Sequence, residues 1–136
     1  MAKSVQMPRM KNPNPHEILV QTKVNYLADQ SDEEAHRYVF AYTITINNIG
    51  TQAAKLLSRH WVITDSNNQV QEVRGQGVVG EQPLLKPKQS FEYTSGTVLA
   101  TDVGTMRGSY QFQAEDGEEF DAPVHEFVLS VPRVLH

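Results

Sequence analysis

Cysteine is absent from the 136 residues of this chain. Its absence excludes a disulfide framework, a zinc site built on thiolates and a cysteine nucleophile. It also fits a reducing compartment, and we expect the protein in the cytoplasm. The length is that of one ordinary domain, which buries enough surface to be stable without disulfides or a structural metal.

Long hydrophobic runs and a strong excess of one charge are missing as well. No segment reaches the length of a membrane span, and the first residues lack the apolar stretch of a secretory signal. The 12 Lys and Arg residues against 16 Asp and Glu residues give a net charge of -4. We therefore expect neither membrane nor nucleic acid as a partner.

A sustained helical period of 3.6 residues is also lacking, whereas a two-residue period runs through most of the chain. Seven short segments rich in β-branched and aromatic residues are separated by turn-forming residues. We predict strands over residues 18–26, 38–46, 56–65, 70–74, 90–99, 106–114 and 120–131. An Asp116-Gly117 pair between the last two predicts a tight hairpin.

This pattern predicts an all-β fold, an immunoglobulin- or fibronectin type III-like β-sandwich of two antiparallel sheets with about seven strands. A partly open barrel is the alternative, because strand patterning does not separate the two. Residues 1–16, with three prolines, are interpreted as a flexible N-terminal tail, and residues 17–136 as the domain. Within 56–65, alternation places Leu57, Trp61 and Ile63 on one face.

Residues 75–80 match the letters of the G-x-G-x-x-G dinucleotide fingerprint. That fingerprint needs a helix after the glycines, and Pro83 and Pro87 interrupt the downstream segment, so we do not expect a dinucleotide site. Two interpretations stay open. The glycines form an irregular crossing between the sheets, or their N–H groups form a nest for an anion such as phosphate. The candidate anion-binding residues are Arg74, Gly75, Gly77 and Gly80.

No catalytic and no metal-ligating set is assigned. The five histidines lack the spacing of a metal site. Ser58 and His60 share a strand face, but no carboxylate is assigned to orient the histidine. The acidic run between Glu115 and Asp121 lacks the order of a calcium loop and is expected to be a solvated hairpin tip, with attraction of a divalent cation as the alternative.

Four segments together resemble the ApaG family. They are residues 56–65 (LLSRHWVITD), 73–83 (VRGQGVVGEQP), 91–96 (FEYTSG) and 104–110 (GTMRGSY), and the resemblance runs from about Glu17 to Pro132. It implies a fibronectin type III-like sandwich. Related domains occur as protein-interaction modules in eukaryotic F-box and polymerase-associated proteins, which supports binding.

The sandwich pattern and the lack of a catalytic set predict a non-enzymatic binding module with a protein partner, and the resemblance supports binding. We expect no cofactor, and a monomer or a homodimer. The family name comes from gene association with a diadenosine tetraphosphatase. The first alternative is accordingly a binder of pyrophosphate or a nucleotide, such as a dinucleoside polyphosphate, through the glycine-rich segment. A link of the family to cobalt resistance and magnesium efflux supplies a weaker alternative, a role in divalent cation homeostasis.

Overall fold

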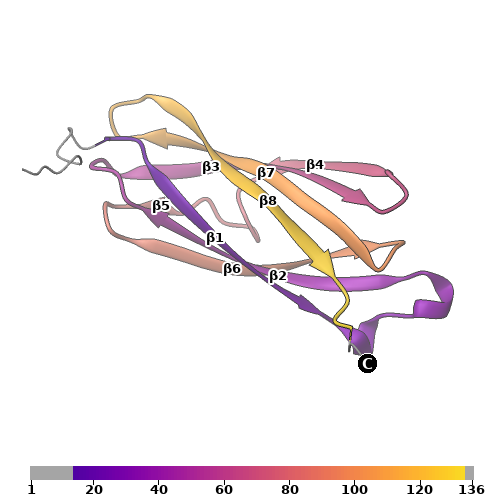
Figure 1. Cartoon of the computed structure of the whole chain (residues 1–136). Coiled ribbons are helices and arrows are strands. Elements are labelled where there is room, and N and C mark those ends of the chain that lie inside the picture. Colours follow the sequence, from indigo (N-terminus) through magenta and orange to yellow (C-terminus); the bar gives the residue numbers. More distant parts are fainter. Residues whose placement is uncertain (1–13, 134–136) are drawn as a thin grey trace, which may run out of the picture.

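Two antiparallel sheets pack face to face in the computed structural model, which describes residues 14–133 (Figure 1). The smaller sheet has the order β1-β2-β6, and the larger has the order β4-β3-β7-β8 with β5 beside β3. The strands are β1 (Ile18–Tyr26), β2 (Tyr38–Asn48), β3 (Ala54–Asp65), β4 (Val70–Gln76), β5 (Leu84–Leu85), β6 (Ser90–Leu99), β7 (Val103–Ala114) and β8 (Glu119–Ser130). The predicted all-β sandwich is confirmed.

All seven predicted strands are present, and β5 adds an eighth. Two residues are too few to show an alternation, so the sequence pattern did not reveal β5. Helix within residues 14–133 is limited to two short 3₁₀ turns, Ala28–Gln30 and Glu33–Ala35. In this described part, no helix has the length and apolar character needed to cross a membrane.

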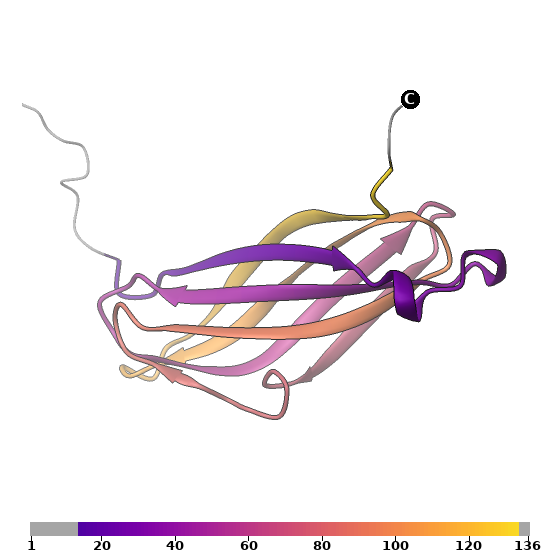
Figure 2. The same cartoon turned by 90° about the horizontal axis from the view of Figure 1, so that it is seen from below.

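The two sides of the sandwich differ. On one side β1 of the smaller sheet contacts β8 of the larger one. On the other side β6 and β4 are the last strands of their sheets, and no pairing joins them within residues 14–133. Figure 2 shows the two layers, with β6 at the edge of the nearer sheet. We call the side between β4 and β6 the open side.

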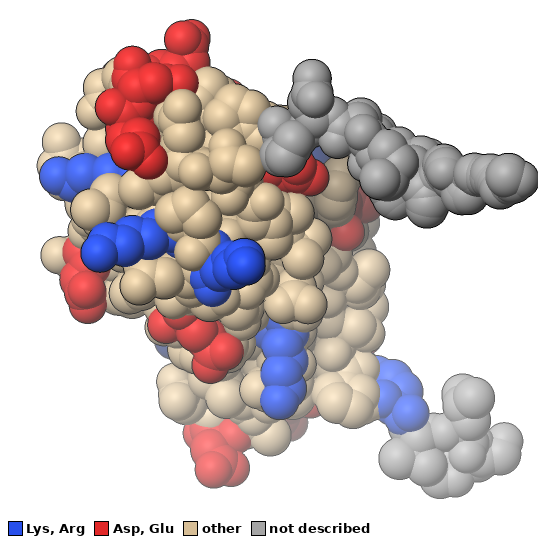
Figure 3. All heavy atoms as spheres, turned by 90° about the vertical axis from the view of Figure 1, so that its left-hand side faces the viewer, with Lys and Arg blue, Asp and Glu red and all other residues tan. Residues whose placement is uncertain are grey.

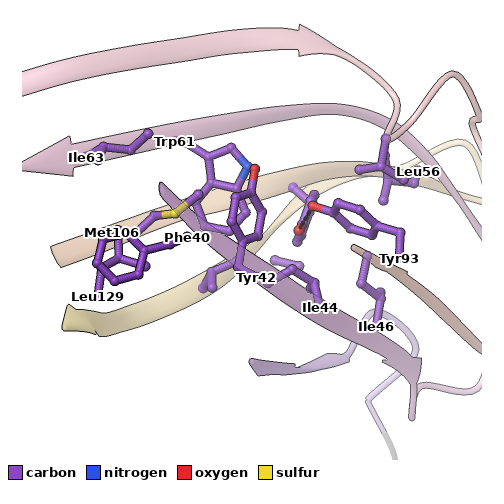
Figure 4. Close-up of a cluster of buried hydrophobic side chains, with 14 of the residues drawn as sticks. Phe40, Tyr42, Ile44, Ile46, Leu56, Trp61, Ile63, Tyr93, Met106 and Leu129 are labelled. Carbon is purple, nitrogen blue, oxygen red and sulfur yellow. Dashed lines mark hydrogen bonds between the residues drawn. The ribbon is translucent and has the colours of Figure 1, made fainter. Parts of the chain in front are cut away.

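Alternation along β2 and β3 fills the space between the sheets. Phe40, Tyr42, Ile44 and Ile46 point inward from β2 and are buried. Trp61 of β3 lies beside Tyr42 (Figure 4). Its ring meets three aromatic rings edge to face, those of Tyr42 at 5.7 Å, Tyr110 at 5.8 Å and Phe127 at 6.1 Å. Such pairs add to the stabilisation from buried area, so Trp61 is the centre of the core.

A β-bulge in β3 corrects one prediction. The register with β7 shifts between Leu56 and Ser58, so the strict alternation breaks there. Leu56 is fully buried, whereas Leu57, which was expected to share the face of Trp61, is only half-buried. Beyond the bulge, Arg59, Trp61 and Ile63 face the smaller sheet.

Contacts of the domain begin earlier than residue 17. The Thr51 N–H donates to the Asn14 carbonyl at 3.2 Å, and the His16 ring stacks on Phe120 with 5.1 Å between centroids. Residues Asn14–His16 were assigned to the tail, but they contact the sandwich. The rest of that predicted tail, residues 1–13, lies outside the described residues.

Candidate functional site

The glycine-rich segment at residues 75–80 is the end of a strand followed by a tight turn. Gly75 and Gln76 still pair with β3. Residues 78–81 form a two-residue hairpin turn, in which Val78 and Glu81 exchange backbone hydrogen bonds of 2.8 Å in both directions. Val79 and Gly80, between them, both have positive φ, as a type I′ turn requires. No helix follows, in agreement with the expectation that this is not a dinucleotide site.

Two of the three glycines have packing reasons. A Cβ atom on Gly75 would lie 2.8 Å from the guanidinium of Arg59, and one on Gly77 would collide with the carbonyl of Glu81. Gly77 also has a φ of 61°, which favours glycine. Its N–H is already bonded to the carbonyl of Leu57, at 2.9 Å. The glycines thus allow close approach within the protein itself.

Arg74 and the glycines are not brought together. Arg74 pairs with His60 in the β3–β4 register and shares its face, the outer face of the larger sheet. There its Nη2 lies 3.7 Å from Glu72 Oε1, and its side chain is 71% exposed. Gly75 faces the opposite side, toward Arg59. Anion binding by Arg74, Gly75, Gly77 and Gly80 stays a prediction. Arg74, the one cation of this predicted site, lies away from the glycines.

The arginine that contacts the glycine-rich segment is Arg59. Its Nη1 donates to the carbonyls of Gln76 at 3.1 Å and Gly77 at 2.8 Å. Sequence reasoning missed Arg59, although a signal was available. Arg59 has the parity of Trp61 and Ile63, so a charged side chain stood on the predicted apolar face of the strand.

Arg59 lies at a cleft of about 420 Å³ on the open side. Residues from both sheets line this cleft, among them Tyr42, Trp61, Val73, Ser95 and Thr97. A second hollow of about 280 Å³ shares Ile63, Gln71 and Val98 with it and extends to Ala100. We call the two together the open-side groove. It has one cation, Arg59, at one end, one carboxylate, Asp65, toward the other, and walls of mixed apolar and uncharged polar residues.

Two tyrosines, Tyr93 and Tyr110, are buried in the core of the sandwich. The hydroxyl groups of Tyr93 and Tyr110 are hydrogen-bonded across the two sheets. Burial raises the pKa of Tyr93 to about 12, although the bond to Tyr110 opposes the rise. Burial also raises the pKa of Tyr110, and the neighbouring Tyr93 adds to the effect. Both phenols therefore stay neutral at physiological pH.

Ser58 and His60 do share the outer face of β3, but they do not form a nucleophile and base pair. The hydroxyl of Ser58 donates to Gln111 Oε1 at 2.8 Å. His60 Nε2 instead lies 3.5 Å from Glu72 Oε1. Because the serine proton is held by an amide oxygen, the arrangement does not activate the serine as a nucleophile.

The acidic hairpin tip between β7 and β8 is used for local structure. Asp116 accepts hydrogen bonds from the backbone N–H of Glu118 and from His16, both at 2.9 Å, and these lower its pKa, with the Glu118 bond as the largest cause. Glu115 accepts from the Ala53 N–H. Acidic side chains gather at the top of Figure 3, where this turn lies. Across residues 14–133, no three His, Asp or Glu side chains converge as metal ligands would.

The strand order and the open-side groove define a fibronectin type III-like sandwich with a cleft between two edge strands. Comparison with known proteins narrows this class. The ApaG domain model matches residues 28–114, which is more than half of the chain. The chain belongs to the ApaG family.

Close relatives support this assignment. Protein ApaG of Nitrosospira multiformis is 64% identical over 121 residues, covering 89% of this chain and 95% of the relative. Protein ApaG of Nitrosomonas eutropha is 61% identical over 127 residues, covering 93% and 100%. The crystal structure of a Bordetella pertussis protein named ApaA superposes with a TM-score of 0.87 at 50% identity, covering 90% of this chain and all of that one. None of these names states a reaction.

Proposed function

We propose that this chain is a non-enzymatic interaction module that binds a partner protein along its open side. The observation that carries the proposal is the placement of two end strands, β4 and β6, on either side of a groove. The free side of an edge strand presents N–H and C=O groups without strand partners. An extended partner segment can bond to such an edge while its side chains enter the groove.

The rest of the surface supports the open side as the binding surface. On the opposite side, contact between β1 and β8 closes the sandwich. At the hairpin tip, the carboxylates of Asp116 and Glu115 are engaged in hydrogen bonds. In the glycine-rich turn, the N–H groups of Gly77, Val78 and Glu81 are already bonded within the protein, which leaves few donors for a pyrophosphate.

Site-specific photo-cross-linking tests this proposal. A photoreactive phenylalanine derivative replaces Thr97, which lines the groove from β6, in the full chain expressed in its own host. The control carries the same group at Gln21, an exposed residue of β1 outside the groove. We expect a discrete protein adduct from position 97 and none from position 21. Equal adducts from both positions, or no adduct from position 97, would contradict the proposal.

A further inference from the structure

Arg59 has no anionic partner among the described residues. No carboxylate within residues 14–133 forms an ion pair with its guanidinium, although Arg74 and Arg133 both have one. Nη1 is bonded to two backbone carbonyls, and none of the hydrogen bonds of this part of the chain uses Nε or Nη2. A guanidinium has five N–H donors in a planar fork. The fork therefore has donors left for a ligand in the cleft.

A second donor in the wall of the same cleft is unpartnered. Trp61 is 2% exposed, and its indole Nε1 has no hydrogen-bond acceptor in the described chain. The indole slightly lowers the pKa of Tyr93, but it does not reach hydrogen-bond geometry with it. A buried polar group without a partner costs free energy, and functional sites are one place where such groups occur. Two side chains that line one cleft thus each carry a donor group without an acceptor.

The charge of the cleft indicates what kind of anion fits. Arg59 is the one ionised side chain in its lining, so the site offers a single positive charge. A planar guanidinium matches a carboxylate through two parallel hydrogen bonds. Trp61 and Val73 give the walls next to it an apolar part, beside the uncharged polar side chains of Gln71, Ser95 and Thr97. A monoanionic carboxylate attached to an apolar group matches both features.

The direction of the groove indicates which residue of a bound partner segment carries that carboxylate. The lining runs from Ala100 and Gln69 past Ile63 to Arg59, and its β4 residues stop at Val73. From Asp65 to Arg59 the strand rises about 20 Å, the length of roughly six extended residues. An extended segment that enters at the Ala100 end therefore meets the cation at its last residue.

We infer that the Arg59 end of the open-side groove binds the C-terminal carboxylate of a partner protein whose last residue is apolar. This inference rests on the proposed function and specifies its partner. The C-terminal carboxylate and the side chain of Asp or Glu share one chemistry, and the apolar wall beside Arg59 favours the chain terminus because its last side chain lies next to the carboxylate.

The single tryptophan of the chain gives a direct readout, because Trp61 supplies the one indole N–H signal in an NMR spectrum. The probes are acetyl-Thr-Val-Thr-Val-Leu with a free carboxylate, the same peptide as its C-terminal amide, and an amidated peptide with an internal Glu. Isocaproate serves as a small free acid. We expect saturable shifts of the indole signal with the free-carboxylate peptide and weaker binding, by about tenfold or more, of both amides.

Paired variants locate the site. Arg59→Gln is expected to weaken binding of the free-carboxylate peptide by about tenfold or more. The matched control Arg74→Gln removes the same charge from the outer face and is expected to leave it unchanged. Arg59 also bonds to Gln76 and Gly77, so Arg59→Gln could weaken binding by disturbing the fold. A second pair of variants keeps Arg59 in place. Ser95→Asp adds a negative charge in the cleft and should abolish binding, whereas Thr94→Asp on the other face of β6 should not.

Three results would overturn the inference: equal binding of acid and amide, equal loss in both members of a pair, and no indole shift with either the peptide or isocaproate. Preference for the internal Glu peptide would also overturn it. These failures differ from failure of the proposed function. If cross-links from position 97 persist while the carboxylate probes fail, the open side still binds a partner and only the carboxylate is wrong.

Discussion

Tyr93 and Tyr110 show how a single pair of residues links burial to pH. Both phenols are buried, their hydroxyl groups are bonded to each other, and burial raises the pKa of both. In the unfolded chain each would ionise near pH 10. Because the folded pKa is higher than the unfolded one, the neutral pair stabilises the fold fully below pH 10, and this contribution is lost as the pH rises.

We therefore predict that the free energy of unfolding falls from about pH 10 upward and continues to fall through about pH 12, where Tyr93 ionises in the folded state. In Tyr93→Phe the fall should be shallower. At neutral pH this variant should be less stable by about 1 to 2 kcal/mol, because the Tyr110 hydroxyl loses its partner. Urea titrations across this pH range measure both effects. An equal slope in variant and wild type would contradict the account.

Asp116 makes a contribution to the stability of the fold that depends on pH in the opposite direction, since it is lost as the pH falls. Its pKa is lowered from 3.8, first by the Glu118 N–H and then by His16, so its ionised form stabilises the fold above the unfolded value. This contribution disappears as the pH falls through the lower, folded pKa. Asp116→Asn should be less stable than wild type near neutrality, and the difference should vanish in strong acid. A difference that is constant with pH in thermal melts would exclude this role.

At the scale of elements, the glycine-rich segment shows what a sequence pattern reveals and what it hides. The sequence pattern reveals the segment itself, because three glycines lie within six residues. Which atoms they make room for depends on pairing between strands far apart in the chain, and this placed Arg59 against Gly75. Arg74, the neighbour in sequence, lies on the other face. Sequence adjacency was therefore a poor guide to the site.

The turn after the glycine-rich strand contains a strained residue. Val79 is β-branched and 55% exposed, yet it has a φ of 41°. A left-handed conformation costs an ordinary L-residue about 1 to 2 kcal/mol, and Asn tolerates it better. Val79→Asn creates the Asn-Gly pair preferred in type I′ turns and should raise the melting temperature. Gly80→Ala, the control with the opposite sign, should lower it. A destabilised Val79→Asn would contradict this turn geometry.

The bulge in β3 supplies a second test at this scale. Simple alternation assigned Leu57 to the core, but the one-residue shift buries Leu56 instead. Leu56→Ala should cost about 2 to 5 kcal/mol because it leaves a cavity in the core. The cost of Leu57→Ala should be clearly smaller. Chemical denaturation of both variants decides between the two registers, and the reverse order would support the unbroken alternation.

At the scale of the whole molecule, the sandwich followed from seven alternating segments and their turns. What could not be read from the pattern is which strands form the ends of each sheet, because that depends on pairing between β2 and β6 and between β3 and β7. These pairings leave β4 and β6 beside an open groove while β1 and β8 close the other side. The binding surface we propose is thus a property of the topology.

The most direct measurement is the affinity of the partner recovered by cross-linking at position 97 for two matched variants. Gln71→Lys puts a charge on the β4 wall of the groove, and Gln21→Lys puts the same charge on β1 outside the groove, both at exposed side chains. Calorimetry should show binding lost or weakened by about tenfold or more in Gln71→Lys. Gln21→Lys should bind as wild type does. Equal affinities of the two variants would contradict the claim that the open side is the binding surface.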